Sequence, residues 1–225
     1  MSKPGAVKPP PDRLYGRAKG HKLRPRQQWL LDTILPRLAV ERGFATPTRE
    51  TWFEIGFGGG EHAQALAAAN PDVGLIACEV FDNGICSLLS RLVPEGHDTA
   101  PLPANLRLWT DDARILLRDM PDASINKLFL MFPDPWPKAR HAKRRFVHPQ
   151  QLDLLARVLA PGGEWRIASD DPTYQAWVAE VLAGQNLFTG AAVTERPAGW
   201  PGTRYEAKAI RAGRVPMYWS LIRRA

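Results

Sequence analysis

Residues 51–60 read Thr-Trp-Phe-Glu-Ile-Gly-Phe-Gly-Gly-Gly, and the alanine-rich segment Glu61–Ala69 follows them directly. The first residues of this stretch favour a strand, the glycines favour a tight turn, and the alanine-rich segment favours a helix that ends at Asn70-Pro71. Side chains at the glycine positions would keep a ligand away from the backbone and would resist positive φ angles. A strand, a glycine turn and a helix in this order are typical of nucleotide-binding α/β proteins, although one such turn is weak evidence by itself.

Strands and helices continue to alternate along the rest of the chain. Strands are also predicted at Val73–Val80, Leu106–Thr110, Ile125–Phe132, Glu164–Ser169, Ala191–Thr194 and Met217–Ile222. Helices are predicted at Trp29–Leu38 with an end near Gly43, at Asn83–Leu92, through Leu116 and Leu117, at Gln150–Leu159 and at Tyr174–Leu182. This alternation predicts the α/β class, with a single doubly wound, mostly parallel seven-stranded sheet covered on both faces. Two consecutive strands at the end predict one antiparallel strand, a common variation at a sheet edge.

The positive charge of the chain is concentrated at its N-terminus. Residues 1–26 hold eight basic residues and the single acid Asp12, whereas residues 27–225 hold 22 of each sign. The length of 225 residues suits one domain. We therefore predict a basic, flexible arm at 1–26 and one domain at 27–225. Such an arm suits a polyanion, because each phosphate that it neutralises releases counterions, but its composition would also fit a solubilising tail.

Several classes of protein are disfavoured by the sequence. The apolar stretches are shorter than the roughly 18 residues of a membrane span, and no secretory signal opens the chain, so we expect a cytoplasmic protein without membrane contact. Cys78 and Cys86 are the only cysteines, and the five histidines show no metal-ligand spacing. We expect no metal site.

Acidic residues accompany the first three predicted strands. Glu54 lies two residues before Gly56, and Glu79 ends the second strand, where a carboxylate can accept hydrogen bonds from both ribose hydroxyls. Asp111 and Asp112 follow the third strand, where a side chain can reach an adenine edge. These features fit a dinucleotide or an S-adenosyl donor. The charge of Glu54 would repel a pyrophosphate but could hold an ammonium group, so the sequence favours S-adenosylmethionine.

A second motif, Phe-Pro-Asp-Pro-Trp-Pro-Lys at residues 132–138, follows a strongly apolar stretch, Ile125–Met131. Its three prolines restrict φ and remove backbone donors, so Asp134 is held on a stiff turn at the end of a strand, where α/β sheets bind ligands. Trp136 beside it could stack on a flat substrate or belong to the core. A cluster without acids suits phosphates and comprises Lys138, Arg140, His141, Lys143, Arg144 and Arg145.

At this point the chain resembles the bacterial tRNA (guanine-N7)-methyltransferases, class I S-adenosylmethionine-dependent enzymes with a Rossmann-like fold. The resemblance covers most of residues 15–224 and rests on residues 54–58, 132–145 and 203–206. The middle block is specific to the family, whereas the glycine turn indicates only the superfamily. This chain has Asp111 before Asp112 where the family has one acid, and Thr-Arg-Tyr-Glu at 203–206 where the family usually has Thr-Lys-Phe-Glu.

The resemblance implies an activity and a set of site residues. The expected reaction transfers a methyl group from S-adenosylmethionine to N7 of a guanine in the variable loop of tRNA and forms 7-methylguanosine. Cofactor contacts are implied for Glu54, Gly56, Gly58, Glu79, Asp112 and Asp134, and Asp134 is also the implied catalytic residue. Substrate contacts are implied for Lys138, Asp170, Thr203, Arg204, Tyr205 and Glu206, and RNA contacts for Arg140, His141, Lys143, Arg144 and Arg145. The sequence does not predict the oligomeric state.

Three other interpretations remain open at this stage. Asp134-Pro135-Trp136 also resembles the acid-Pro-Pro-aromatic turn of enzymes that methylate exocyclic amines of bases. A noncatalytic RNA-binding protein on a methyltransferase fold would share the basic segments, although the intact acids argue against it. A dehydrogenase is disfavoured by Glu54.

Asp170 and Asp171 could also cap the helix that begins near Pro172.

Overall fold

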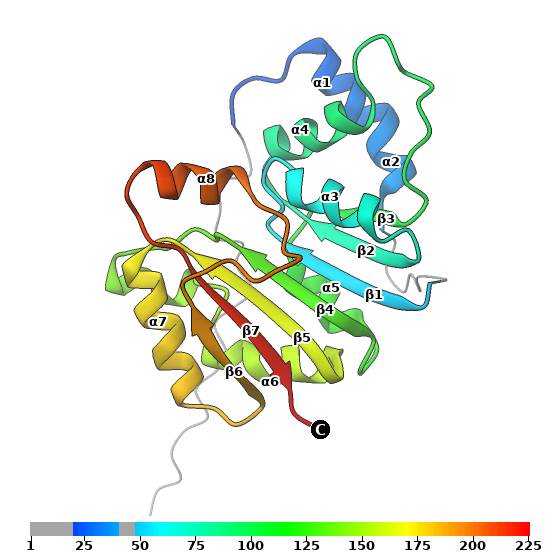
Figure 1. Ribbon diagram of the computed structural model, residues 1–225. Helices are drawn as coiled ribbons and strands as arrows, with labels where there is room; N and C mark the ends of the chain where they lie inside the picture. The colour runs from blue at the N-terminus through cyan, green and yellow to red at the C-terminus, as the bar shows by residue number, and fades with distance from the viewer. Residues whose placement is uncertain (1–19, 41–47) are drawn as a thin grey trace, which may run out of the picture.

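The computed structural model describes residues 20–40 and 48–225 and shows one seven-stranded sheet in the order β3-β2-β1-β4-β5-β7-β6 (Figure 1). The strands are β1 (Glu50–Ile55), β2 (Val73–Cys78), β3 (Leu106–Trp109), β4 (Ile125–Met131), β5 (Leu159–Ser169), β6 (Phe188–Val193) and β7 (Met217–Arg223). Only β7 runs against the others, antiparallel to both β5 and β6. The predicted α/β class, the seven strands and the single antiparallel strand are confirmed. The antiparallel strand lies one place inside the edge, because β7 inserts between β5 and β6.

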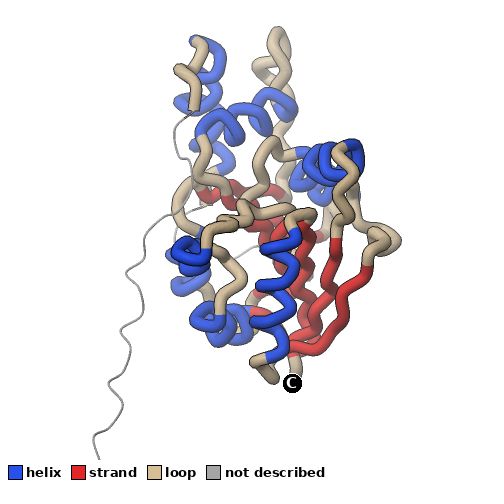
Figure 2. Tube along the Cα trace, turned by 90° about the vertical axis from the view of Figure 1, so that its left-hand side faces the viewer, coloured by secondary structure: helices blue, strands red, loops and turns tan. Residues whose placement is uncertain are grey.

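Helices cover both faces of the sheet (Figure 2). They are α1 (Pro25–Trp29), α2 (Leu35–Leu38), α3 (Glu61–Ala69), α4 (Asp82–Leu92), α5 (Ala113–Asp119), α6 (Pro149–Val158), α7 (Pro172–Ala183) and α8 (Arg204–Arg211). A π-helical segment, η1 (Leu30–Ile34), joins α1 to α2, and η2 (Ala139–Arg144) is a 3₁₀-helix. Neither α8 nor η2 was predicted. Pro25 and Arg26 already belong to α1, so the last residues of the predicted arm begin the folded body.

The first helical region ends earlier than its apolar spacing predicts. It stops at Leu38, not near Gly43, because Ala39 bridges to Leu108 and the N–H of Val40 donates to the carbonyl of Leu108 in β3 at 2.9 Å. The chain therefore changes from helix to a strand-like contact at this point.

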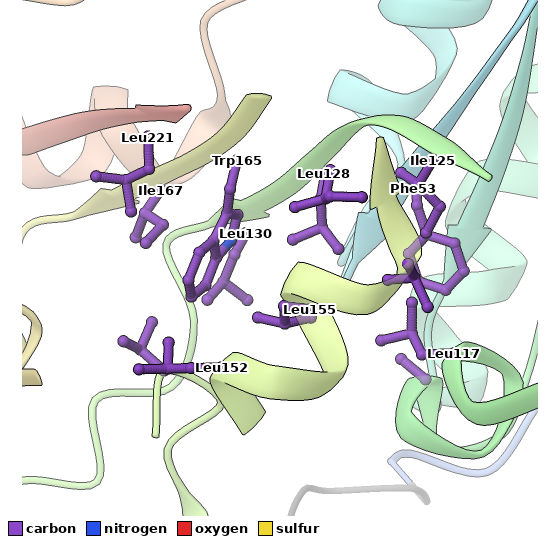
Figure 3. Packing of buried hydrophobic residues seen from close by; sticks show 14 of the residues in the cluster. Phe53, Leu117, Ile125, Leu128, Leu130, Leu152, Leu155, Trp165, Ile167 and Leu221 are labelled. Carbon is purple, nitrogen blue, oxygen red and sulfur yellow. The ribbon is translucent and has the colours of Figure 1, made fainter. Parts of the chain in front are cut away.

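Alternation along the central strands divides the core into two layers. In β1, Phe53 faces the layer that contains α5, α6 and α7, whereas Trp52 faces the layer that contains α1–α4. Figure 3 shows Leu152 and Leu155 of α6 packed toward Leu130 and Trp165. This packing fixes α6 beneath β4 and β5, the strands that lead to the proline turn and to Asp170.

We expect the substitution Leu155→Ala to lower the free energy of unfolding by about 2–5 kcal/mol, because Leu155 is fully buried and its loss leaves a cavity. Denaturant unfolding followed by circular dichroism measures this change. Asp153→Ala, at an exposed position of the same helix, is the control and should change it by less than about 1 kcal/mol. Equal effects of the two substitutions would contradict this description of the core.

Candidate active site

A cavity of about 420 Å³ opens at the carboxyl ends of β1, β2, β3 and β4. Its wall includes the glycine turn after β1, the end of β2, the first residues of α5 and the proline turn after β4. Crossovers to opposite sides of β1 leave a crevice at this edge of the sheet, which is where doubly wound folds bind ligands.

The glycine turn has a backbone that other residues would strain. Gly56, Gly58 and Gly60 have φ angles of 73°, 58° and 81°. A Cβ atom on Gly58 would also lie 3.1 Å from the ring of Tyr205 on α8. Gly58 is therefore needed both for the left-handed conformation and for the close approach of α8.

Glu79 fixes the glycine turn to the end of β2. Its Oε2 accepts the N–H of Gly58 at 2.7 Å, and its Oε1 accepts the N–H groups of Val80 at 2.7 Å and Phe81 at 3.0 Å. The pKa of Glu79 is raised overall. Burial is the largest cause of the increase, the three backbone hydrogen bonds oppose it, and the charge of Asp134 adds to it. The carboxylates of Glu79 and Asp134 therefore face the same cavity, and the charge of Asp134 acts on Glu79. Each oxygen of Glu79 has two lone pairs, so Oε1 is fully used and Oε2 can accept one further donor such as a hydroxyl.

Glu54 of β1 and His62 of α3 form a buried pair. Glu54 is 1% exposed, and its Oε1 lies 3.0 Å from Nδ1 of His62, the second residue of α3. The other oxygen, Oε2, is buried and has no hydrogen-bond partner among the described residues. His62 packs edge-on against Phe129 of β4. No motif in the sequence points to His62, because its contact with Glu54 depends on how the glycine turn folds α3 back over β1.

Asp112 lines the cavity and begins α5. It accepts the N–H of Arg114 at 3.0 Å as the helix cap and also forms an ion pair with the guanidinium of Arg114. Asp111 lines the same cavity, but its carboxylate accepts the N–H of Asp112 at 2.7 Å. Both acids therefore reach the cavity, and each is already bonded within the β3–α5 loop.

The proline turn presents Asp134 from a strained backbone. Phe132 and Trp136 have φ angles of 53° and 45°, which are unfavourable for residues other than glycine. Between them, Asp134 is exposed and lines the cavity with Trp136. Such conformations cost on the order of 1–3 kcal/mol each and persist where the surrounding structure enforces them.

The basic segment separates into surface residues and one buried residue. Lys138, Arg140 and Lys143 are exposed, and the guanidinium of Arg144 lies 4.7 Å from the ring centre of Trp136. Arg145, in contrast, is 6% exposed and is directed at the backbone of the proline turn. An RNA contact was predicted for Arg145 and stays a prediction; its burial could not be seen in the sequence, because a linear run of cations does not show which of them is turned inward.

His141 lies beside the ring of Trp136 in an edge-to-face arrangement, with ring centres 5.7 Å apart. Partial desolvation and then the positive charges of Arg144 and Arg140 lower the pKa of His141. Its uncharged form is therefore favoured near neutral pH.

The segment 203–206 starts α8 with a capping box. The N–H of Glu206 donates to the hydroxyl of Thr203 at 3.0 Å, and the N–H of Thr203 donates to Glu206 at 3.3 Å. Glu206 is buried, pairs with Arg196 at 2.9 Å and accepts the hydroxyl of Tyr218. These bonds hold Thr203 and Glu206 at the start of α8.

The remaining predicted substrate residues divide between two places. Tyr205 lines the cavity, and Arg204 lies against Gly59 of the glycine turn. Asp170 forms an ion pair with Arg214, and the N-cap of α7 is Asp171.

The structure thus brings about half of the predicted residues into one wall. The wall contains Gly56, Gly58, Glu79, Asp112, Asp134, Lys143, Arg144, Arg145 and Tyr205. It does not contain Glu54, Lys138, Arg140, His141, Asp170, Thr203, Arg204 or Glu206.

Across residues 20–40 and 48–225, no group of three or more His, Cys, Asp and Glu side chains could hold a metal ion, and no helix there is long and apolar enough to cross a bilayer.

A doubly wound sheet with an antiparallel seventh strand, and a nucleoside-sized cavity at its carboxyl edge lined by glycines and acids, defines a class I methyltransferase. A family model described as "Putative methyltransferase" matches residues 48–218. The chain is 66% identical to a "tRNA (guanine-N(7)-)-methyltransferase" of Granulibacter bethesdensis, over 97% of this chain and 98% of that protein. A protein of the same name from Paramagnetospirillum magneticum is 48% identical, over 95% and 93%. The chain belongs to the tRNA (guanine-N7)-methyltransferase family.

Solved structures support the fold. The 16S rRNA methyltransferase KamB aligns with a TM-score of 0.58 and 16% identity, over 79% of this chain and 89% of that one. This likeness concerns the architecture alone.

We expect His62→Ala to weaken binding of S-adenosylhomocysteine by about tenfold, because a buried carboxylate that loses its partner costs about 1–3 kcal/mol and Glu54 would no longer be held in place. Titration calorimetry measures the affinity. His62→Gln retains a donor and should lose less. Unchanged affinity in His62→Ala, with an unchanged unfolding midpoint, would show that the pair does not support the cofactor site.

Proposed function

We propose that this protein transfers a methyl group from S-adenosylmethionine to N7 of a guanine in the variable loop of tRNA and forms 7-methylguanosine. The observation that carries the proposal is that Asp134, on its proline turn, shares one cavity with the glycine turn and Glu79. The relatives at 66% and 48% identity, named as tRNA (guanine-N7)-methyltransferases, support the substrate and the position on the base.

The residues of the cavity suit the cofactor. Oε2 of Glu79 can accept one ribose hydroxyl while it holds the N–H of Gly58, and the glycines let a ligand approach the backbone. The buried and unpaired Oε2 of Glu54 is suited to an ammonium donor near the same turn. When bound, S-adenosylmethionine supplies an electrophilic methyl group on a sulfonium.

The main tasks of the protein in this reaction are placement and charge compensation. Guanine N7 carries a lone pair and no proton, so no general base is needed to expose the nucleophile. Asp134 would accept hydrogen bonds from the guanine edge and offset the positive charge that develops on the methylated base. Trp136, in the same wall, would support the flat ring. Alignment of the two reactants can supply several kcal/mol of the barrier reduction.

The surrounding cations suit the phosphates of an RNA. N7 in an A-form helix lies in a deep, narrow groove, so the target guanine must be unstacked, as a loop permits. Lys138, Arg140 and Lys143 are exposed, Lys143 lines the cavity, and these cations would hold phosphates of the RNA.

Identification of the product tests this function. Purified protein is incubated with bulk tRNA and labelled S-adenosylmethionine, and the modified nucleoside is identified by mass spectrometry. Label in 7-methylguanosine, mapped to the variable loop by cleavage at that nucleoside, is the expected result. Label in a base with a methylated exocyclic amine would favour the competing N-methyltransferase, and cofactor binding without any transfer would favour a noncatalytic RNA-binding protein.

We expect Asp134→Asn to lower turnover by about 100-fold, because the neutral amide cannot offset the charge on the base. Binding of S-adenosylhomocysteine should fall much less, because the backbone contacts of Glu79 and the glycine turn remain. Single-turnover kinetics and calorimetry measure the two effects. Asp153→Asn is the matched control on the surface of α6. Full turnover with weakened cofactor binding would refute the role of Asp134.

We also expect the N-terminal arm to add salt-sensitive affinity for tRNA. The predicted arm lies largely in residues 1–19, outside the described part of the chain, and Arg26 pairs with Asp98 at 2.7 Å in the folded body. The cleanest variant therefore removes residues 2–19, which hold five basic residues.

This variant should bind tRNA more weakly at low salt, should show a shallower dependence of log K on log salt, and should keep its affinity for S-adenosylhomocysteine. A second variant replaces the five basic residues by Gln at constant length and separates charge from length. Identical tRNA affinity across salt concentrations would exclude the arm from binding.

A further inference from the structure

We propose that Arg145 is a positioning residue for methyl transfer, which holds the Asp134 carboxylate in place through the backbone of the proline turn. The inference rests on the role proposed above for Asp134. It separates Arg145 from the surface cations of the same segment.

The contacts of Arg145 are made with the turn itself. Nε donates to the carbonyl of Pro135 at 3.1 Å, and Nη2 donates to the carbonyl of Trp136 at 3.0 Å. These are the two carbonyl groups that directly follow Asp134 in the chain. A planar guanidinium bonded to both of them fixes the relative orientation of two consecutive peptides, which a single donor cannot do.

The proline turn needs such a support from outside. Pro133, Pro135 and Pro137 have no N–H group, and no backbone–backbone hydrogen bond that we find in the described chain involves residues 133–137. Phe132 and Trp136 are also held at positive φ. Strained conformations of this kind persist only when neighbouring groups constrain them. The guanidinium of Arg145 bonds two carbonyl groups of this turn.

Arg145 is itself immobilised. It is 6% exposed, and its guanidinium lies 5.0 Å from the ring centre of Trp177 on α7. The indole N–H of Trp177 donates to the carbonyl of Val147, two residues after Arg145. In the part of the chain that the structure describes, we find no carboxylate paired with Arg145, so carbonyl dipoles and an aromatic face stabilise its charge. Burying a cation without a counter-charge is costly, which argues for a role beyond filling space.

The test separates positioning from RNA binding and from general stability. Arg145→Lys keeps the charge, but a lysine ammonium does not reproduce the planar fork that bonds both carbonyl groups. We expect kcat to fall between about 10- and 100-fold, because a displacement of the order of 1 Å at the reacting group has effects of this size. Because a positioning residue touches neither ligand, we expect less than about a twofold change in three quantities: the KM for tRNA, the salt dependence of this KM, and the Kd for S-adenosylhomocysteine.

Two further variants complete the experiment. Arg145→Gln avoids a buried ammonium. If the lysine variant folds poorly, the glutamine variant allows the same comparison of kcat with the KM for tRNA and the Kd for S-adenosylhomocysteine. Lys143→Ala, at an exposed neighbouring position, is the reference for a lost phosphate contact and should raise the KM for tRNA and reduce its salt dependence.

A double-mutant cycle with Asp134→Asn links Arg145 to its target. If Arg145 acts through Asp134, Arg145→Lys should slow the Asp134→Asn enzyme by less than about twofold. A raised KM for tRNA with kcat unchanged would assign Arg145 to RNA binding and overturn the proposal. A lower unfolding midpoint, together with an unchanged kcat at a temperature well below that midpoint, would assign a purely structural role to Arg145. This result would also overturn the proposal. Full turnover of Asp134→Asn alone would instead overturn the proposed role of Asp134, so the two failures are distinguishable.

Discussion

The pairing of β1 with β4 is the constraint on which the site depends. Glu54 is in register with Phe129 and Ile55 with Leu130, so the two strands end side by side. Because one strand continues into the glycine turn and the other into the proline turn, this register brings the two motifs to opposite sides of one crevice. A slip of one residue would exchange the faces of every side chain in a strand and would bring Glu54 to the side occupied by Phe53. The buried cores on both faces of the sheet therefore also maintain the geometry of the cavity.

Three acids near this crevice have different environments, which suit different tasks. Glu54 is buried and bonded on one side only, Glu79 accepts three backbone N–H groups and keeps one acceptor site on Oε2, and Asp134 is exposed. A buried carboxylate with a free acceptor oxygen suits a permanently charged cation. Binding of the cation offsets the free-energy cost of burying the carboxylate. An exposed carboxylate on a stiff turn suits a charge that appears only during the reaction, because it loses little solvation when no substrate is bound.

Most of the fold could be predicted from the sequence because its signals are local. Period-two and helical spacing, glycines and prolines identify the seven strands and the helices on both faces. The helix α8 was not predicted, although Thr203 and Glu206 carry the spacing of a capping box, because it buries only Glu206 and Ala209 and so lacks an apolar stripe. The place of β7 inside the edge could not be predicted, since it depends on which of two late strands pairs with β5.

The site was predictable where a residue acts through its place on a strand end, and not where it acts through a tertiary contact. Gly58, Glu79 and Asp134 follow directly from the ends of strands. The contact of His62 with Glu54 joins two elements, and the inward direction of Arg145 follows from the path of η2 around the proline turn. A run of cations in a sequence can therefore hold positions of different kinds. Lys143 within η2 is exposed, whereas Arg145, directly after η2, is buried against the backbone of the proline turn. The two positions carry the same charge, and burial, which the sequence does not show, separates them.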